Sequence, residues 1–358
     1  MIPVSKPFLP PIHEYQAYIN DIWERNWLTN DGPLVRRLEN ELVASQRLKY
    51  LLFVSNGTMA LQMALKALNI SGEVITTPFS YVATTSSLVW EGITPVFSDI
   101  DAKTFNIDPK KIESKITAKT SAILATHVYG NPCEIDAIQE IADKHGLKVI
   151  YDAAHCFGAM YKGKSVMSYG DISTISFHAT KLFHTTEGGA VITNDRNIHD
   201  KLFFLRNFGH NGPDKFKEVG INGKNSEFHA AMGICNLKYV AEILKKRKIL
   251  HSIYDQLLMG VEIEKPAFIE GDYKYSYYPI LFNSNKIREE VFVWLANEGV
   301  FARKYFYPLL TKLNYVEASD VPVAESIADR ILCLPMYHDI TEAEIGVVSQ
   351  LVQKIIND

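Results

Sequence analysis

The chain has 358 residues, of which 47% are apolar and 22% are charged. This balance is typical of a globular protein, and the length favours a large domain followed by a smaller one. The formal charge of −4 argues against a nucleic-acid partner, because nucleic-acid binding requires basic surfaces.

Residues from about 35 to 235 alternate short apolar runs with longer helical patterns. The apolar runs predict strands at 51–54, 74–77, 94–97, 122–126, 149–151, 171–176 and 190–193. Amphipathic segments at 59–68 and 133–145 predict helices between some of these strands. The alternation is typical of an α/β fold with a mostly parallel central sheet that is flanked by helices on both faces.

Beyond this region the pattern predicts a long helix at 236–248 that leads into a smaller C-terminal α+β domain. We expect strands there at 275–282 and 301–305, and helices at 286–297 and 341–356. The predicted division is a large domain with an N-terminal arm at residues 1–240 and a small domain at residues 241–358.

Four segments whose residues could bind a ligand or take part in catalysis come just after predicted strands. They are the segment around Gly57, residues 78–81, Asp152 and Lys181. Ligands of such sheets bind at the carboxyl ends of the strands. We therefore treat these segments as parts of one site.

The first segment, Ser55-Asn56-Gly57-Thr58, follows an apolar run and starts a helix. Glycine lets the backbone approach a ligand closely, and a helix N-terminus offers unpaired N–H groups with partial positive charge. A phosphate would bind at Gly57, with the Thr58 hydroxyl as a further donor. An ordinary turn and helix cap explains the same residues equally well.

Aromatic residues follow the next predicted strand, at Phe79 and Tyr81. An aromatic side chain at this strand exit can stack on a flat ligand ring, and we favour Tyr81 for that role. Core packing is the alternative, because most aromatic residues are used in that way.

Asp152 directly follows the predicted strand at 149–151, and His155 lies three residues further on. An acidic residue at the end of a buried strand is destabilising unless it has a partner. The protonated nitrogen of a pyridine ring would be such a partner, whereas capping of a helix is the alternative. His155 would lie against the same ring or contact its phenolic oxygen, and a structural histidine is equally compatible.

Ser176 and Lys181 stand in the motif Ser-Phe-His-Ala-Thr-Lys, shortly before Gly188 and Gly189. The serine hydroxyl can reach a phosphate while the lysine amine holds an aldehyde as a Schiff base. The following apolar strand places Lys181 inside the fold, where burial lowers the pKa of an ammonium group. With Asp152, these residues describe a site for pyridoxal 5'-phosphate, with Lys181 and Asp152 as the catalytic residues.

Other polar residues allow less specific predictions. His178 is a candidate for substrate contact, or it serves packing. His178 and His184 have no matching cysteine or carboxylate cluster, so we expect no metal site. Asn222 and Lys224, in a polar loop before a helix, would supply donors and charge to a phosphate from outside the main cleft, unless the loop is only surface.

The four cysteines are scattered without C-x-x-C spacing, which fits a reducing compartment. The N-terminal residues are too polar for a signal peptide, and no apolar run approaches the ~18 residues of a membrane span. We therefore expect a cytoplasmic protein that has no membrane partner.

Taken together, the motifs resemble those of the DegT/DnrJ-type nucleotide-sugar aminotransferases, which belong to the aspartate-aminotransferase-like, fold type I, class of pyridoxal-phosphate enzymes. The resemblance covers nearly the whole chain. It includes segments 27–33, 55–61, 127–132, 152–158, 176–181, 222–231 and 334–337.

The resemblance implies that Lys181 is the Schiff-base lysine and Asp152 the partner of the pyridine nitrogen. The other implied cofactor ligands are Gly57, Thr58, Tyr81, His155, Ser176, Asn222 and Lys224. In the family the loop matching Asn222 and Lys224 reaches into the neighbouring subunit's site, which implies a homodimer with shared active sites. The family mostly has arginine or asparagine where Lys224 stands, and a lysine offers no fork geometry to a phosphate.

Within the family, the opening residues, the loop at 27–30 and the lysine motif most resemble enzymes that aminate a nucleotide-linked sugar at C4. Such enzymes convert dTDP-4-keto-6-deoxyglucose with L-glutamate as the amino donor, for O-antigen or other surface glycans. Thr29, His178 and Tyr305 are the candidate substrate residues. Amination at C3, or of a UDP-sugar at C4, is the alternative.

Three rival functions have weaker support. In the related dehydratases a histidine replaces the Schiff-base lysine, so Lys181 opposes that activity. A nicotinamide oxidoreductase would need G-x-G-x-x-G after the first strand, and this chain lacks it. A non-catalytic binding protein would not need Lys181, Asp152 and Ser176 together.

Overall fold

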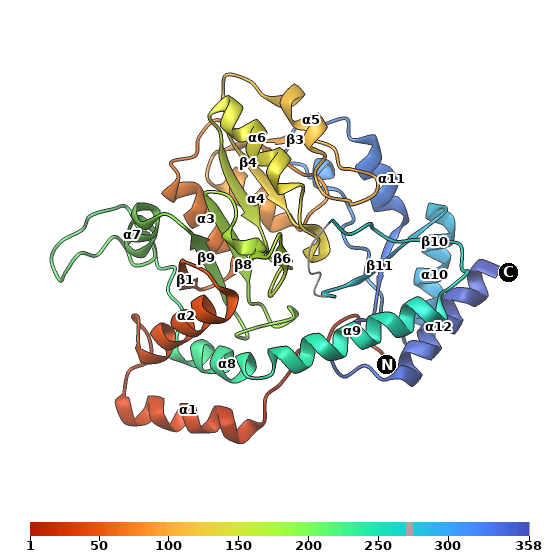
Figure 1. The fold of residues 1–358 in the computed structure, drawn as a ribbon, viewed down its shortest axis with the longest axis horizontal. Helices are drawn as coiled ribbons and strands as arrows, with labels where there is room; N and C mark the ends of the chain where they lie inside the picture. Colours follow the sequence, from red (N-terminus) through yellow and green to blue (C-terminus); the bar gives the residue numbers. More distant parts are fainter. Residues whose placement is uncertain (270–274, 358) are drawn as a thin grey trace.

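The computed structural model describes residues 1–269 and 275–357, and a seven-stranded sheet lies at its centre (Figure 1). The strand order is β1-β9-β8-β5-β4-β2-β3. The strands are β1 (Tyr50–Val54), β2 (Glu73–Thr76), β3 (Thr94–Phe97), β4 (Thr120–Thr126), β5 (Lys148–Asp152), β8 (Ile172–Ser176) and β9 (Gly189–Thr193). Only β9 runs antiparallel to its neighbours, β1 and β8. The predicted mostly parallel sheet is confirmed.

Alternate residues of each strand pack into two different apolar clusters, one on each face of the sheet. On β1, Leu51 and Phe53 join one cluster, whereas Leu52 and Val54 join the other. Successive side chains of a strand point to opposite faces, so both faces of this sheet are covered. This burial on both faces explains why the strands appear in the sequence as continuous apolar runs.

Helices cover the two faces as expected for such a sheet (Figure 1). The first cluster includes residues of α2 (Pro33–Gln46), α6 (Ile135–His145) and α8 (Glu227–Leu237). The second includes residues of α3 (Gly57–Ala67), α4 (Val82–Trp90) and α7 (Arg196–Leu205). The helix α1 (Ile12–Arg25) lies outside these layers, against α8 (Figure 1).

The C-terminal part has its own apolar cluster, with Tyr254, Ile280 and Leu295 among its buried residues. Its antiparallel sheet has the order β10-β11-β12. The elements are α9 (Val240–Leu257), β10 (Ile263–Glu264), β11 (Tyr278–Phe282), α10 (Asn285–Asn297), α11 (Pro322–Arg330), β12 (Ile331–Leu334) and α12 (Glu342–Asn357). The N-terminus also lies here (Figure 1), because Ile2 pairs with Val300. The boundary at residue 240 stays a prediction.

Two predicted elements are wrong. The single helix at 236–248 is split, because α8 ends at Leu237 and α9 begins at Val240. The N–H of Tyr239 bonds to the carbonyl of Asn236, which makes a tight turn between them. The strand at 301–305 is reduced to one bridge between Arg303 and Cys333, because the N–H groups of Tyr305 and Tyr307 form local turns instead of sheet bonds.

Within residues 1–269 and 275–357, no helix is both long and apolar enough to cross a membrane.

Candidate active site

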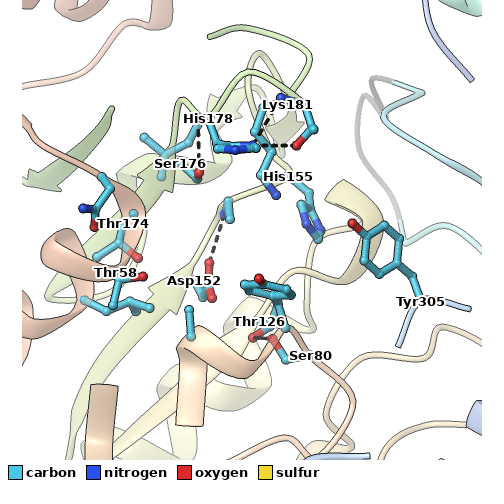
Figure 2. Close-up of a pocket in the computed structure, with 18 of the residues that line it drawn as sticks. Thr58, Ser80, Thr126, Asp152, His155, Thr174, Ser176, His178, Lys181 and Tyr305 are labelled. Atoms are coloured by element: carbon cyan, nitrogen blue, oxygen red, sulfur yellow. Dashed lines mark hydrogen bonds between the residues drawn. The ribbon is translucent and has the colours of Figure 1, made fainter. Parts of the chain in front are cut away.

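A cavity of about 360 Å³ opens at the carboxyl ends of β1, β5 and β8. Its lining combines residues of the central sheet with residues of the C-terminal part. Nine residues singled out in the sequence line it: Gly57, Thr58, Tyr81, Asp152, His155, Ser176, His178, Lys181 and Tyr305. In Figure 2, Asp152 lies between Thr58 and Thr174 on one side and Tyr305 on the other.

One end of the cavity is formed by the N-terminus of α3 and by Ser176 at the end of β8. The helix begins there because the Asn56 side chain caps it, accepting a hydrogen bond of 2.8 Å from the N–H of Met59. A Cβ atom at Gly57 would lie 3.0 Å from the Cβ of Ser176. Glycine therefore keeps this helix end close to the serine and leaves N–H groups and hydroxyls facing the cavity. Such an arrangement is suited to a phosphate.

Asp152 lies at the end of the central strand β5 and is 6% exposed. Its Oδ2 accepts a hydrogen bond of 2.8 Å from Thr84 Oγ1, and its Oδ1 accepts one of 3.1 Å from the N–H of Ala154. Burial raises the pKa of Asp152, whereas these two donors and the positive charge of Lys181 oppose the rise. The carboxylate thus lies in a low-dielectric site but is already oriented.

Lys181 also faces the cavity (Figure 2). Burial lowers the pKa of its ammonium group to about 8, although the Asp152 carboxylate opposes this shift. The positive charge of Arg303 lowers the pKa further. A larger fraction of Lys181 is therefore neutral, and able to act as a nucleophile or base, than of an ordinary surface lysine.

His155 is held between aromatic rings. It stacks on Phe306 with ring centres 5.9 Å apart and meets Tyr277 edge-on at 4.8 Å. Burial lowers the pKa of His155 well below its usual value, so the ring is neutral. Among the described residues its buried Nδ1 has no hydrogen-bond partner. A buried polar atom without a partner is unusual, and this one stands in the wall of the cavity.

The remaining lining residues are more exposed. His178 Nδ1 is 2.8 Å from Thr180 Oγ1, and its Nε2 is 3.5 Å from a carboxylate oxygen of Glu187. The Tyr305 hydroxyl accepts a hydrogen bond of 2.6 Å from Arg303. His178 and Tyr305 therefore belong to a polar rim of the cavity, where a substrate would enter.

The two aromatic candidates after β2 have different environments. Phe79 is fully buried and contacts Phe105, Tyr129 and Phe306 edge-on. Tyr81 is 58% exposed and lines the cavity. Of these two, only Tyr81 is available to a ligand ring.

Three predicted site residues do not line this cavity: Thr29, Asn222 and Lys224. Thr29 lies in an exposed loop after α1. Lys224 Nζ donates to Asn222 and Asn207, with both distances at 2.8 Å. The loop of Lys224 nevertheless adjoins the site, because the carbonyl of Gly223 accepts a hydrogen bond from the N–H of Ser55.

The sequence reasoning missed several residues that form the site. Thr84, Ser80 and Thr126 surround Asp152, and Tyr277 and Glu187 contribute to the cavity wall. Thr84 lies in a run of four hydroxyl residues at 84–87, which gave no signal of which one turns toward the site. Within the described ranges, no group of three or more histidine, cysteine or acidic residues is arranged to hold a metal ion.

Known proteins resemble this chain over nearly its whole length. A model of the DegT/DnrJ/EryC1/StrS aminotransferase family matches residues 12–353. The chain is 43% identical to dTDP-4-amino-4,6-dideoxy-D-glucose transaminase of Shigella dysenteriae, with 98% of each chain covered. It is 32% identical to GDP-perosamine synthase of Escherichia coli O157:H7, with 100% of this chain and 99% of that one covered.

Among solved structures, DesI in the presence of its TDP-sugar product superposes with a TM-score of 0.94 and 32% identity, covering 99% of this chain and 92% of DesI. The aspartate-aminotransferase-like fold expected from the sequence is thereby confirmed. So is the expected resemblance to enzymes that aminate a nucleotide-linked sugar at C4, since the Shigella relative is one of them. The chain therefore belongs to the DegT/DnrJ/EryC1/StrS aminotransferase family.

Proposed function

We propose that this protein is a pyridoxal-phosphate-dependent aminotransferase. It would move an amino group from L-glutamate to the C4 keto group of a nucleotide-linked 4-keto-6-deoxy sugar, such as dTDP-4-keto-6-deoxyglucose. The product would serve O-antigen or other surface-glycan synthesis. The observation that carries the proposal is the meeting of Lys181, Asp152 and the N-terminus of α3 in one cavity of a chain that belongs to this family.

The residues present fit the cofactor. The N-terminus of α3, with Gly57, Thr58 and Ser176, would hold its phosphate. Asp152 would hold the ring nitrogen, Tyr81 would stack on the ring, and the unpaired Nδ1 of His155 would offer the cofactor a polar contact. Lys181 would hold the aldehyde carbon through its amine. When bound, the cofactor supplies an electron-withdrawing ring that accepts the electron pair released at the amino-acid carbon.

Residues of the protein would supply the remaining functions: proton transfer, protonation of the ring nitrogen and exclusion of water. Lys181, once its amine is free, would take the proton from the amino-acid carbon in the first half-reaction and would deliver a proton to the sugar carbon in the second. Its amine suits this role because burial brings its pKa to about 8. Asp152 would keep the ring nitrogen protonated through its negative charge. The neutral aromatic wall of His155, Tyr277 and Phe306 would exclude water from the reacting carbon.

Both substrates are anionic, and the cavity rim offers positive charge to them. Among the described residues no carboxylate pairs with Arg303; its guanidinium lies 4.8 Å from the centre of the Tyr305 ring. Arg303, Tyr305 and His178 would therefore bind the carboxylates of glutamate or the diphosphate of the sugar nucleotide. Thr29, in the exposed loop after α1, is our remaining candidate for substrate contact.

The test of the function is a reaction with a panel of substrates. The purified protein, supplied with pyridoxal phosphate and L-glutamate, is expected to aminate dTDP-4-keto-6-deoxyglucose, with the new C–N bond at C4 by NMR. The panel includes the 3-keto isomer, the UDP-linked 4-keto sugar and the GDP-linked 4-keto sugar. Faster turnover of another member would change the assigned substrate, and no amination of any member would end the proposal.

We further propose a homodimer whose two active sites are shared between subunits. Support comes from apolar side chains that are exposed on and beside α1, namely Leu9 (70%), Ile12 (66%) and Trp23 (67%). Exposed patches of this kind are typical of protein interfaces. In such a dimer Lys224 and Asn222 would complete the phosphate site of the neighbouring subunit.

Mixed dimers test this sharing. Lys181→Ala and Lys224→Met subunits are each expected to form impaired homodimers. If the sites are shared, a dimer with one subunit of each kind has one intact site, so it should recover about half of the wild-type turnover. The control replaces Lys224→Met with Lys215→Met, an exposed lysine of the same region; a homodimer of that variant should be fully active. Mixed dimers that recover no activity would contradict shared sites.

A further inference from the structure

The carboxylate of Asp152 is the end of a chain of buried hydroxyl groups. Thr84 Oγ1 lies 2.8 Å from Asp152 Oδ2, and Ser80 Oγ lies 2.7 Å from Thr84 Oγ1. Thr126 Oγ1 lies 3.0 Å from Ser80 Oγ. The three hydroxyl residues are at most 3% exposed, and Figure 2 shows Ser80 and Thr126 beside Asp152 at the cavity floor.

The direction of these hydrogen bonds follows from elementary counting. Each hydroxyl group has one hydrogen to donate. An ionised carboxylate only accepts, so Thr84 donates to Asp152 and must accept from Ser80. Ser80 has then used its hydrogen and must accept from Thr126. The chain therefore runs one way, from Thr126 through Ser80 and Thr84 to the carboxylate.

A protonated Asp152 would fit this arrangement less well than the ionised form. A proton on Oδ1 would face the N–H of Ala154, which is itself a donor. A proton on Oδ2 would reverse all three hydroxyl groups and turn the hydrogen of Thr126 away from Ser80. Among the described residues, no other hydrogen bond engages the Thr126 hydroxyl. Both carboxylate oxygens are thus matched to the ionised form.

Among the described residues, Lys181 is the one charged group that shifts the pKa of Asp152. The titratable groups near Asp152 in the described part of the chain include Lys181, His155, His127 and Cys156. Burial lowers the pKa of His127 to about 3 and that of His155 well below its usual value, so both rings are neutral. Burial also raises the pKa of the Cys156 thiol, which stays protonated. Arg303 and Glu187 also line the cavity but are not among the groups that shift the pKa of Asp152. Lys181 lies across the cavity from Ser80 and Thr126 (Figure 2).

We propose that Thr126, Ser80 and Thr84 form a one-way chain of hydroxyl donors that keeps Asp152 ionised and fixed in orientation, with Thr84 as the decisive positioning residue. The inference rests on the proposed function for its catalytic consequence, because an ionised Asp152 is what the ring nitrogen requires. The ionisation of Asp152 itself depends on the protein's own residues and not on the proposed function. Successive hydroxyl bonds polarise one another, so the first donor strengthens the last bond.

Thr85 offers a matched control for the test. Thr85 is adjacent to Thr84 in α4 and is equally buried, but its Oγ1 has no hydrogen-bond partner among the described residues. Thr84→Val and Thr85→Val therefore make the same replacement, of a hydroxyl group by a methyl group, at adjacent positions of the same helix. Thr84→Ser keeps the hydroxyl at the position that matters.

The experiment follows the Asp152 carboxyl carbon by ¹³C NMR as pH is varied, in the full-length protein without added cofactor. The Asp152 signal is identified by its absence in Asp152→Asn. Thr84→Val should raise the titration midpoint of Asp152 by roughly 1 pH unit, because a hydrogen bond to the charged form is lost. Ser80→Ala should raise it by less, Thr84→Ser should restore it, and Thr85→Val should leave it unchanged.

The pH profile of turnover gives a second readout. The acid limb of kcat/KM should move to higher pH in Thr84→Val and return in Thr84→Ser. An unchanged Asp152 midpoint in Thr84→Val, or an equal rise in Thr85→Val, would overturn the proposal. If Thr84→Val does not fold, the Ser80→Ala midpoint decides. A wild type that titrates as expected but aminates no sugar would refute the proposed function and leave the hydroxyl chain intact.

Discussion

Replacement of Lys181 by alanine is expected to lower turnover by at least ~10³-fold, because a positioned base that moves the proton is lost. Covalent attachment of the cofactor should be lost with it. After borohydride reduction and digestion, the wild-type peptide containing residue 181 should carry the mass of the reduced cofactor, and the same peptide of Lys181→Ala should not. Lys181→Met should behave alike, since it fills the space but has no amine.

The pH dependence of attachment is a sharper form of the same prediction. The neutral amine is the nucleophile, and burial places the pKa of Lys181 at about 8. The rate at which cofactor-free protein attaches pyridoxal phosphate should therefore rise with pH and level off above about 8, instead of near the 10.5 of an exposed lysine. Lys110→Ala, at an exposed position, is the control. A cofactor mass on a peptide other than that of residue 181 would refute the assignment.

The strands of the central sheet could be predicted because burial on both faces makes them continuous apolar runs. The predicted strand at 94–97 coincides with β3, and the other predicted boundaries lie within two residues of the observed ones. What these runs could not reveal is direction. Nothing in the composition of 190–193 shows that β9 runs antiparallel to β8, since its residues are buried on both faces like those of the parallel strands.

Long-range polar partners were the least predictable features of the fold. Glu227 is fully buried and accepts hydrogen bonds from the N–H groups of Leu34 and Val35, so it caps α2 from a distant part of the sequence. In the sequence it is only an acidic residue near the start of a helix. The pairing depends on how α2 and α8 pack, and that packing is set by the whole apolar core.

The residues of the candidate site also differ in how well the sequence predicts them. Gly57, Asp152, Ser176 and Lys181 could be proposed because each follows a strand end, and strand ends meet at one edge of the sheet. Thr84 could not, because its role depends on the rotation of α4. One residue further along the helix, Thr85 points its hydroxyl to no partner among the described residues. A helical rotation of about 100° per residue separates the two, and no local pattern fixes it.

Asp152→Asn is expected to keep the fold and lose most of the activity. The amide has the shape of the carboxylate, and its oxygen can still accept from the N–H of Ala154. Its NH₂ group would meet Thr84 Oγ1 as a donor, and the hydroxyl chain through Ser80 and Thr126 can reverse. We therefore expect the melting temperature to change by only a few degrees, because the free energy of unfolding should fall by about 1 kcal/mol at most.

The catalytic consequence of Asp152→Asn should be much larger, because the amide has no negative charge with which to keep a ring nitrogen protonated. Turnover should fall by roughly 10²-fold, the equivalent of a lost charge-assisted hydrogen bond in a buried site. Cofactor attachment to Lys181 should persist, which separates this variant from Lys181→Ala.

Asp171→Asn is the control for Asp152→Asn. Asp171 is a carboxylate beside the other end of the same strand, where it accepts a hydrogen bond from the N–H of Val149. That variant should keep its turnover. Near-normal rates in Asp152→Asn would show that this carboxylate does not hold the ring nitrogen, and the direction in which the hydroxyl chain runs would then have no bearing on catalysis.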